Sequence, residues 1–91
     1  MSDLEENGRK ILDAAIEEWV IGKNGERDRF IMRMHLFDGP SMLQMQKRLE
    51  KMGREKEDQS YELSIDRIKK IILARQDQIQ KHIESKDIGA G

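Results

Sequence analysis

Apolar residues recur every three or four positions through four segments of the chain, a spacing that places them on one face of an α-helix. The pattern predicts helices at about Leu4 to Ile21, Glu26 to Phe37, Pro40 to Met52 and Ile65 to Glu84. The first apolar stripe consists of Ile11, Leu12, Ala15, Ile16, Trp19 and Val20. The last stripe consists of Ile65, Ile68, Ile72, Ile79 and Ile83.

Glycine, proline and serine punctuate these segments. Residues 22–25, with the sequence GKNG, end the first helix, and Asp38-Gly39 ends the second. Pro40-Ser41 suits a helix start, because proline has a helical φ and the serine hydroxyl caps free amide groups. Gly53 is predicted as the C-terminal cap of the third helix, and Ser64 as the N-cap of the fourth.

The chain therefore divides into an acidic N-terminal helix at 1–22, a helical domain at 26–84 and a disordered tail at 85–91. Residues 54–62 carry dense alternating charge and are predicted to form a loop or a frayed extension of the third helix. On the second helix, the face opposite the apolar stripe consists of Arg27, Asp28, Arg29 and Arg33.

Composition supports one small all-α domain of four helices. The chain has 91 residues, of which 36% are hydrophobic and 38% charged, with one Pro and no Cys. The polar N-terminus does not resemble a secretory signal, and no apolar run approaches the roughly 20 residues that span a bilayer. We expect a soluble, cytoplasmic protein without a membrane partner.

Candidate catalytic chemistry is sparse. The two histidines, His35 and His82, lie on different predicted helices without the partner spacing of a metal site. Each glycine between the helices is isolated, so no phosphate-binding loop is indicated. The carboxylates alternate with Lys and Arg on polar faces. We therefore expect a protein that is not an enzyme and needs no cofactor or metal.

Charge is polarised along the chain. Six acids and two bases give residues 1–22 a charge of −4, whereas five bases and two acids give residues 63–83 a charge of +3. The acidic helix is expected to pack on the other helices. The other interpretations are that its acidic face contacts RNA polymerase or another regulator, or that it mimics DNA.

Residues 26–83 resemble region four of the bacterial sigma-70 factors and the small sigma-like regulators of phages and prophages. The resemblance rests on the corner Phe37-Asp38-Gly39 and on the run Ser64-Ile65-Asp66-Arg67-Ile68-Lys69-Lys70-Ile71. It implies a helix-turn-helix formed by the last three helices, in which the helix beginning near Ile65 reads DNA. The segment between Gly53 and Leu63 is longer than the family's turn, and the supporting helix is bulkier.

This resemblance implies a DNA-binding transcription regulator whose partner is double-stranded DNA, with RNA polymerase or another regulator as a protein partner. Lys and Arg on the last helix would contact phosphates, while Arg67 and Gln76 could read base edges. A homodimer is a further hypothesis, because one short helix gives limited affinity. The predicted DNA-binding residues are Ser64, Asp66, Arg67, Lys69, Lys70 and Gln76.

The alternative is a non-enzymatic helical module that binds a protein, such as RNA polymerase or a phage or bacterial regulator, without touching DNA. Any amphipathic helix has a charged outer face, so charge alone favours this reading. Under it, exposed apolar residues among Met32, Met42 and Trp19 would carry binding. Methionine at helical spacing more often forms core, and we expect this for Met32, Met34, Met42, Met45 and Met52.

Overall fold

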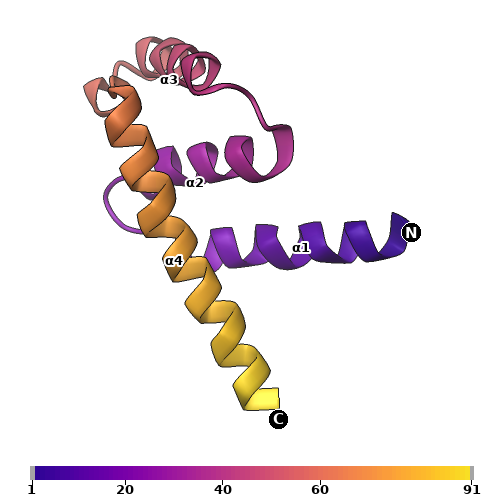
Figure 1. Ribbon diagram of the computed structural model, residues 1–91. Helices are drawn as coiled ribbons and strands as arrows, with labels where there is room; N and C mark the ends of the chain where they lie inside the picture. Colours follow the sequence, from indigo (N-terminus) through magenta and orange to yellow (C-terminus); the bar gives the residue numbers. More distant parts are fainter. Residues whose placement is uncertain (1, 91) are drawn as a thin grey trace.

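The computed structural model describes residues 2–90, and side chains from residue 6 to residue 85. Within that range it contains four α-helices and no strand, which confirms the all-α class. The helices are α1 (Ser2–Trp19), α2 (Gly25–Arg33), α3 (Met42–Lys56) and α4 (Ile65–Ala90). A π-helical turn, Met34–Asp38, continues α2, and a 3-10 turn, Gln59–Tyr61, lies between α3 and α4 (Figure 1).

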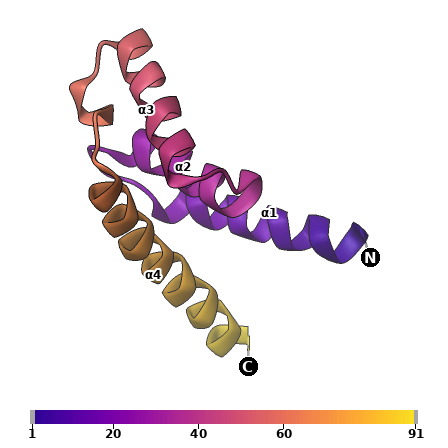
Figure 2. The same ribbon diagram turned by 45° about the horizontal axis from the view of Figure 1, so that its top comes forward.

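The molecule is elongated because two helices project from its body. The C-terminal end of α1 lies against α4, and from there the N-terminal end of α1 and the C-terminal end of α4 diverge (Figures 1 and 2). The principal extents are 45 × 29 × 22 Å and the radius of gyration is 14.2 Å. A compact domain of this length would have a radius of about 12 Å.

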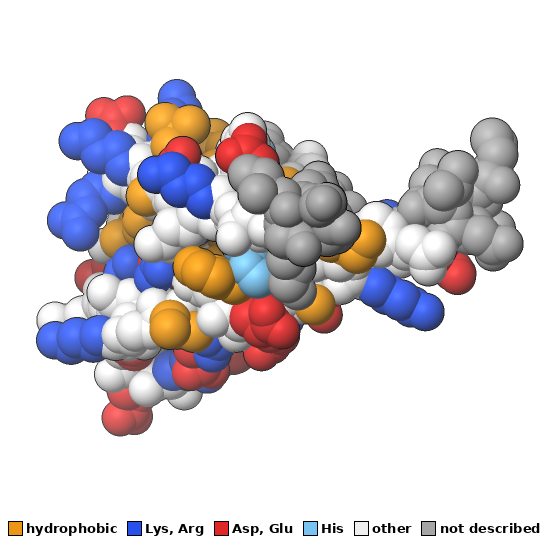
Figure 3. Space-filling view, turned by 90° about the horizontal axis from the view of Figure 1, so that it is seen from below, with side chains coloured by type: hydrophobic (Ala, Val, Ile, Leu, Met, Phe, Trp, Pro, Cys, Tyr) orange, Lys and Arg blue, Asp and Glu red, His pale blue; other side chains and the backbone are white. Residues whose placement is uncertain are grey.

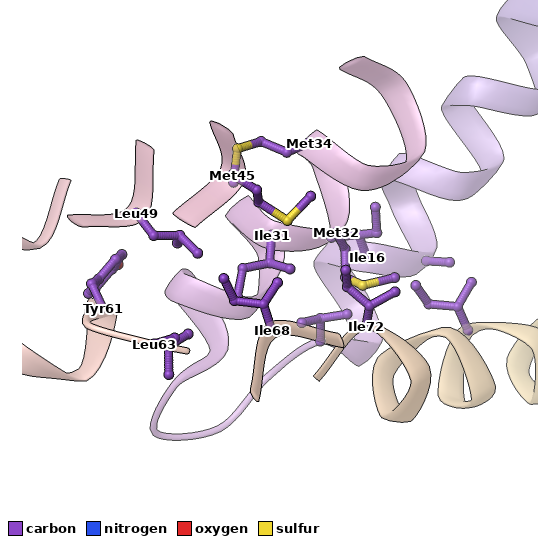
Figure 4. Close-up of a cluster of buried hydrophobic side chains, with 13 residues drawn as sticks. Ile16, Ile31, Met32, Met34, Met45, Leu49, Tyr61, Leu63, Ile68 and Ile72 are labelled. Atoms are coloured by element: carbon purple, nitrogen blue, oxygen red, sulfur yellow. The ribbon is translucent and has the colours of Figure 1, made fainter. Parts of the chain in front are cut away.

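The apolar stripes of all four helices meet in one core (Figure 4). Met32 and Met45 are fully buried there, which confirms their predicted place in the core. Trp19 and Ile11 belong to the predicted stripe of α1 but remain 45% and 58% exposed, because the stripe is wider than the surface that covers it. The buried apolar residues are Ala15, Ile16, Val20, Ile31, Met32, Met34, Met45, Leu49, Tyr61, Leu63, Ile68, Ile72 and Ile79.

The acidic helix α1 packs on α2 and α4, as expected. Arg33 of α2 donates one hydrogen bond to Asp13, at 2.8 Å, and another to Glu17. These bonds, with the one to Glu17 having the larger effect, raise the pKa of Arg33. Glu18 lies 3.5 Å from His82 of α4. The C-terminal acids of α1 therefore help to hold it against its neighbours.

A buried carboxylate connects α2 with α4. Asp28 is 4% exposed and accepts hydrogen bonds from Arg27 and Arg75, each at 2.9 Å. The two arginines also donate to the backbone carbonyls of Ser60 and Ile21, respectively. Arg27 and Asp28 were predicted on the polar face of their helix, so their burial corrects that prediction. The burial is tolerated because each charged group has hydrogen-bond partners.

The cap predicted at Gly53 is wrong, whereas residues 54–56 do form an extension of α3, which was the alternative to a loop. The helix continues past Gly53 to Lys56 and ends where Glu57 adopts a left-handed conformation, with φ 54°. Lys56 bonds Glu26 of α2 at 2.6 Å, which fastens this additional turn to the body. Gly53 is therefore a helix-interior residue and not a cap.

Residues 57–64 form an ordered connection between α3 and α4. The carboxylate of Asp58 accepts hydrogen bonds from the hydroxyl and the backbone N–H of Ser60, which lower the pKa of Asp58. Tyr61 and Leu63 are buried, and Gln46 of α3 donates to the carbonyl of Leu63 at 3.0 Å. The predicted loop is thus shorter than expected and is anchored in the core.

Gly53 is required by close packing. A Cβ at this position would lie 2.7 Å from Cβ of Tyr61 and 2.9 Å from the carbonyl oxygen of Asp58. We expect Gly53→Ala to lower the unfolding free energy by about 1–3 kcal/mol, because side chain and backbone must both shift. The matched control is Gly8→Ala in α1, where no atom lies within 4 Å of the added Cβ. Urea denaturation should show the control to be neutral or slightly stabilising; equal effects of the two substitutions would contradict this packing.

The predicted caps of the last two helices are confirmed. The Ser41 hydroxyl accepts from the N–H of Gln44, whose side chain accepts from the N–H of Ser41. The Ser64 hydroxyl accepts from the N–H of Arg67 at 3.2 Å. At its other end, α4 continues to Ala90, beyond the predicted end near Glu84. The side chains of residues 86–90 and all of residue 91, which belong to the predicted tail, lie outside the described part.

Candidate nucleic-acid interface on α4

The inner face of α4 is fixed by the isoleucine stripe. Ile68, Ile72 and Ile79 are buried against the other helices, while Ile65 and Ile83 are half-buried near the two ends of the stripe. This packing orients the helix and turns its opposite face to solvent. We call that exposed face, from Ser64 to Gln76, the outer face of α4.

All six residues predicted to contact DNA are exposed. They do not point in one direction, because successive residues of a helix are rotated by about 100°. Lys69 and Gln76 lie about 20° apart, Lys70 lies about 100° from Lys69, and Arg67 lies about 160° from Lys69. Lys69, Lys70 and Gln76 thus share a surface with Asp66. Arg67 lies at the edge of this surface that is farthest from Lys69. The Ser64 hydroxyl is engaged as the helix cap.

The basic residues at the start of α4 have no ion-pair partner in the part of the chain whose side chains are described. Arg67, Lys69 and Lys70 make no salt bridge with any described residue. Further along the helix, Arg75 is bound to Asp28, and Lys81 lies 3.1 Å from Asp77. Of the basic segment predicted at 63–83, only the first turns, with Arg67, Lys69 and Lys70, therefore carry cations without a salt bridge to a described residue. Among the cations engaged in ion pairs elsewhere are Arg27, Arg33, Arg48 and Lys56.

A further cation lies beside the start of α4, and the sequence did not single it out. Arg54 of α3 lines a shallow cleft of about 340 Å³ together with Ser64. Its side chain is exposed and forms no salt bridge within the described range. Glu50 and Glu62 line the same cleft, so the corner carries both signs of charge. The two residues are ten positions apart in the sequence, and the shared cleft shows that Arg54 and Ser64 are neighbours.

Lys and Arg side chains are numerous on the end of the body away from the projecting N-terminal end of α1 (Figure 3). Acidic side chains lie among them at that end, and a further acidic patch lies beside the histidine (Figure 3).

An apolar groove lies on another side of α4. Leu12, Leu36, Ile79 and Ile83 line it, with Met32 at its base and a volume of about 370 Å³. Met32 is itself fully buried, so it is not an exposed binding residue. The polar lining of the groove is provided by Gln76, Gln80 and Glu84. Such a groove is a feature that a protein partner could use.

The two histidines have different surroundings. His82 is 9% exposed, and its ring centroid lies 4.6 Å from that of Trp19 with the two rings tilted by 40°, where α1 crosses α4. His35 is half-buried in the π-helical turn. Among the residues whose placement is described, no group of three or more His, Cys, Asp and Glu side chains could hold a metal ion.

None of the helices in the described range is both long and apolar enough to cross a membrane. Comparison with models of protein families, with curated proteins and with solved structures finds no match to this chain. The likeness to sigma region four therefore stays a prediction from the residues themselves.

Proposed function

We propose that this protein is a small DNA-binding transcription regulator that contacts double-stranded DNA through the outer face of α4. The observation that carries the proposal is the set of exposed cations Arg67, Lys69 and Lys70, which form no salt bridge with a described residue and lie on a helix whose inner face is fixed in the core. The resemblance to region four, including that of phage and prophage regulators, supports transcription as the process.

The outer face has the groups that such contact requires. Lys69 and Lys70 would bind phosphate oxygens and hold the helix along the major groove, which is wide enough to admit an α-helix. Gln76 could pair with adenine and Arg67 with guanine, as their donor groups allow. The carboxylate of Asp66 would be repelled by phosphate. It would instead accept a hydrogen bond from a base with a donor group in the major groove, such as the amino group of cytosine.

Two residues at the start of α4 support the same contact. Ser64 caps the helix, whose N-terminal N–H groups favour a nearby phosphate. Arg54 of α3 lies close enough to share a cleft with Ser64. It would add a phosphate contact from the preceding helix.

The alternative function is a protein-interaction module, and the apolar groove between α1 and α4 is the observation that favours it. In that case RNA polymerase or another regulator would place apolar side chains against Leu12, Leu36 and Ile83. Trp19 is also 45% exposed where it contacts His82 of α4 and could contribute. The two surfaces meet at Gln76, which also lines the groove, while Lys69 and Lys70 lie outside the groove.

Fluorescence anisotropy of a labelled mixed-sequence duplex tests the proposal. If Lys69, Lys70 and Arg54 each neutralise one phosphate, the logarithm of the binding constant should fall with the logarithm of salt with a slope of about −2.7. Affinity should then drop about fortyfold between roughly 50 mM and 200 mM salt. Absence of binding at the lower salt concentration, or binding that salt does not weaken, would contradict the proposal.

A further inference from the structure

Leu73 is an apolar residue in the middle of the outer face of α4. It is 68% exposed, more than the other large hydrophobic residues that the structure describes as exposed. By helical rotation it lies about 40° from Lys69 and about 60° from both Lys70 and Gln76. A bulky aliphatic side chain therefore stands between Lys70 on one side and Lys69 with Gln76 on the other, the residues that we place on DNA.

Leu73 does not continue either of the other apolar surfaces. It is about 120° around the helix from Ile79, which lines the groove shared with α1. It is about 160° from Arg75, whose guanidinium reaches the carbonyl of Ile21 on the side where Trp19 lies. An isolated leucine with cations on both sides is a poor protein-docking patch, because such patches are contiguous.

From this placement we infer that Leu73 determines base preference by contacting the C5-methyl group of a thymine in the major groove. The inference rests on the proposed DNA binding. With Lys69 and Lys70 on phosphates, a side chain between them points to the floor of the groove. The thymine methyl is the apolar group that base pairs present there, and apolar side chains recognise it. The contact would remove both the leucine and the methyl group from water.

The test removes that methyl group alone. Duplexes that bind the full-length protein are selected from a randomised pool, and each thymine of the preferred sequence is replaced in turn by deoxyuridine, which keeps the base pair. Leu73→Ala is compared with wild type, and Leu43→Ala serves as the matched control, because Leu43 is a 52% exposed leucine on α3. Circular dichroism confirms that both exposed substitutions leave the fold intact.

At one or two positions, deoxyuridine should weaken wild-type binding roughly fourfold, the effect expected for one buried methyl group. Leu73→Ala should bind thymine and uracil duplexes equally, while Leu43→Ala should keep the wild-type difference. Two results would overturn the role of Leu73 while leaving DNA binding in place. One is an equal preference for thymine in wild type and Leu73→Ala, and the other is a selection that yields no preferred sequence. Failure of the wild type to bind any duplex would overturn the proposed function and this inference with it.

Discussion

Replacing Asp28 by alanine is expected to lower the unfolding free energy by about 3–5 kcal/mol. The substitution removes the carboxylate that pairs with both Arg27 and Arg75, and it leaves a buried and a partly buried guanidinium group without a counter-charge. A chain of this length has a total unfolding free energy of about 5–14 kcal/mol. The variant should therefore be marginally stable or unfolded at ambient temperature.

Urea denaturation followed by circular dichroism measures this effect. The matched control is Asp38→Ala, because Asp38 also pairs with an arginine, Arg48, but at 3.7 Å and with both side chains at least half exposed. An exposed pair of this kind contributes about 0–1 kcal/mol. If Asp28→Ala and Asp38→Ala have the same midpoint, the buried network does not hold α2 to α4 as described.

The combined substitution Lys69→Glu and Lys70→Glu is expected to weaken DNA binding at least about a hundredfold. Two charge-assisted contacts to phosphate are lost, each worth about 1.5–3 kcal/mol, and two carboxylates then face the backbone. Both lysines are exposed and make no salt bridge with a described residue, so stability should change by less than about 0.5 kcal/mol. Anisotropy at low salt measures the affinity, and urea denaturation checks the fold.

A control with the same change in net charge separates a specific surface from general repulsion. Lys47 and Lys51 of α3 are exposed and likewise form no salt bridge within the described residues. Changing both to glutamate should weaken binding far less than the α4 reversal does. Equal losses would mean that overall charge, and not the outer face of α4, governs the association.

The helices and their ends could be predicted where they depend on residues that are close together in the sequence. The isoleucine stripe of α4 identified its buried face, because a helix places every third or fourth residue on one side. Ser41 and Ser64 were recognisable as caps, since the hydroxyl of a serine satisfies amide groups only three residues away.

Interactions between distant segments could not be predicted in this way. Asp28 and Arg75 are 47 positions apart in the sequence, and Asp28 looked like an ordinary member of a polar face. One signal was present: Arg75 continues the spacing of Ile68, Ile72 and Ile79, which places a charge on the buried face of α4. A charge in that position requires a buried partner. Gly53 was mistaken for a cap because its neighbour Tyr61 reaches it only after the chain has turned.

For the candidate interface, the sequence predicted the residues of α4 but not their surroundings. The exposure of Lys69, Lys70 and Gln76 follows from the isoleucine stripe alone. Three features depend instead on how α2, α3 and α4 pack. They are the bond from Arg75 to Asp28, the position of Arg54 beside Ser64, and the exposure of Leu73 between the cations.

The most direct test of the central claim is nuclear magnetic resonance mapping, in which isotope-labelled protein is titrated with an unlabelled DNA duplex. We predict that amide shifts will concentrate on residues 64–77, with smaller changes at Arg54, while the groove lined by Leu12, Leu36 and Ile83 remains unaffected. Shifts confined to that groove, or none at all up to saturating duplex, would contradict DNA binding through α4.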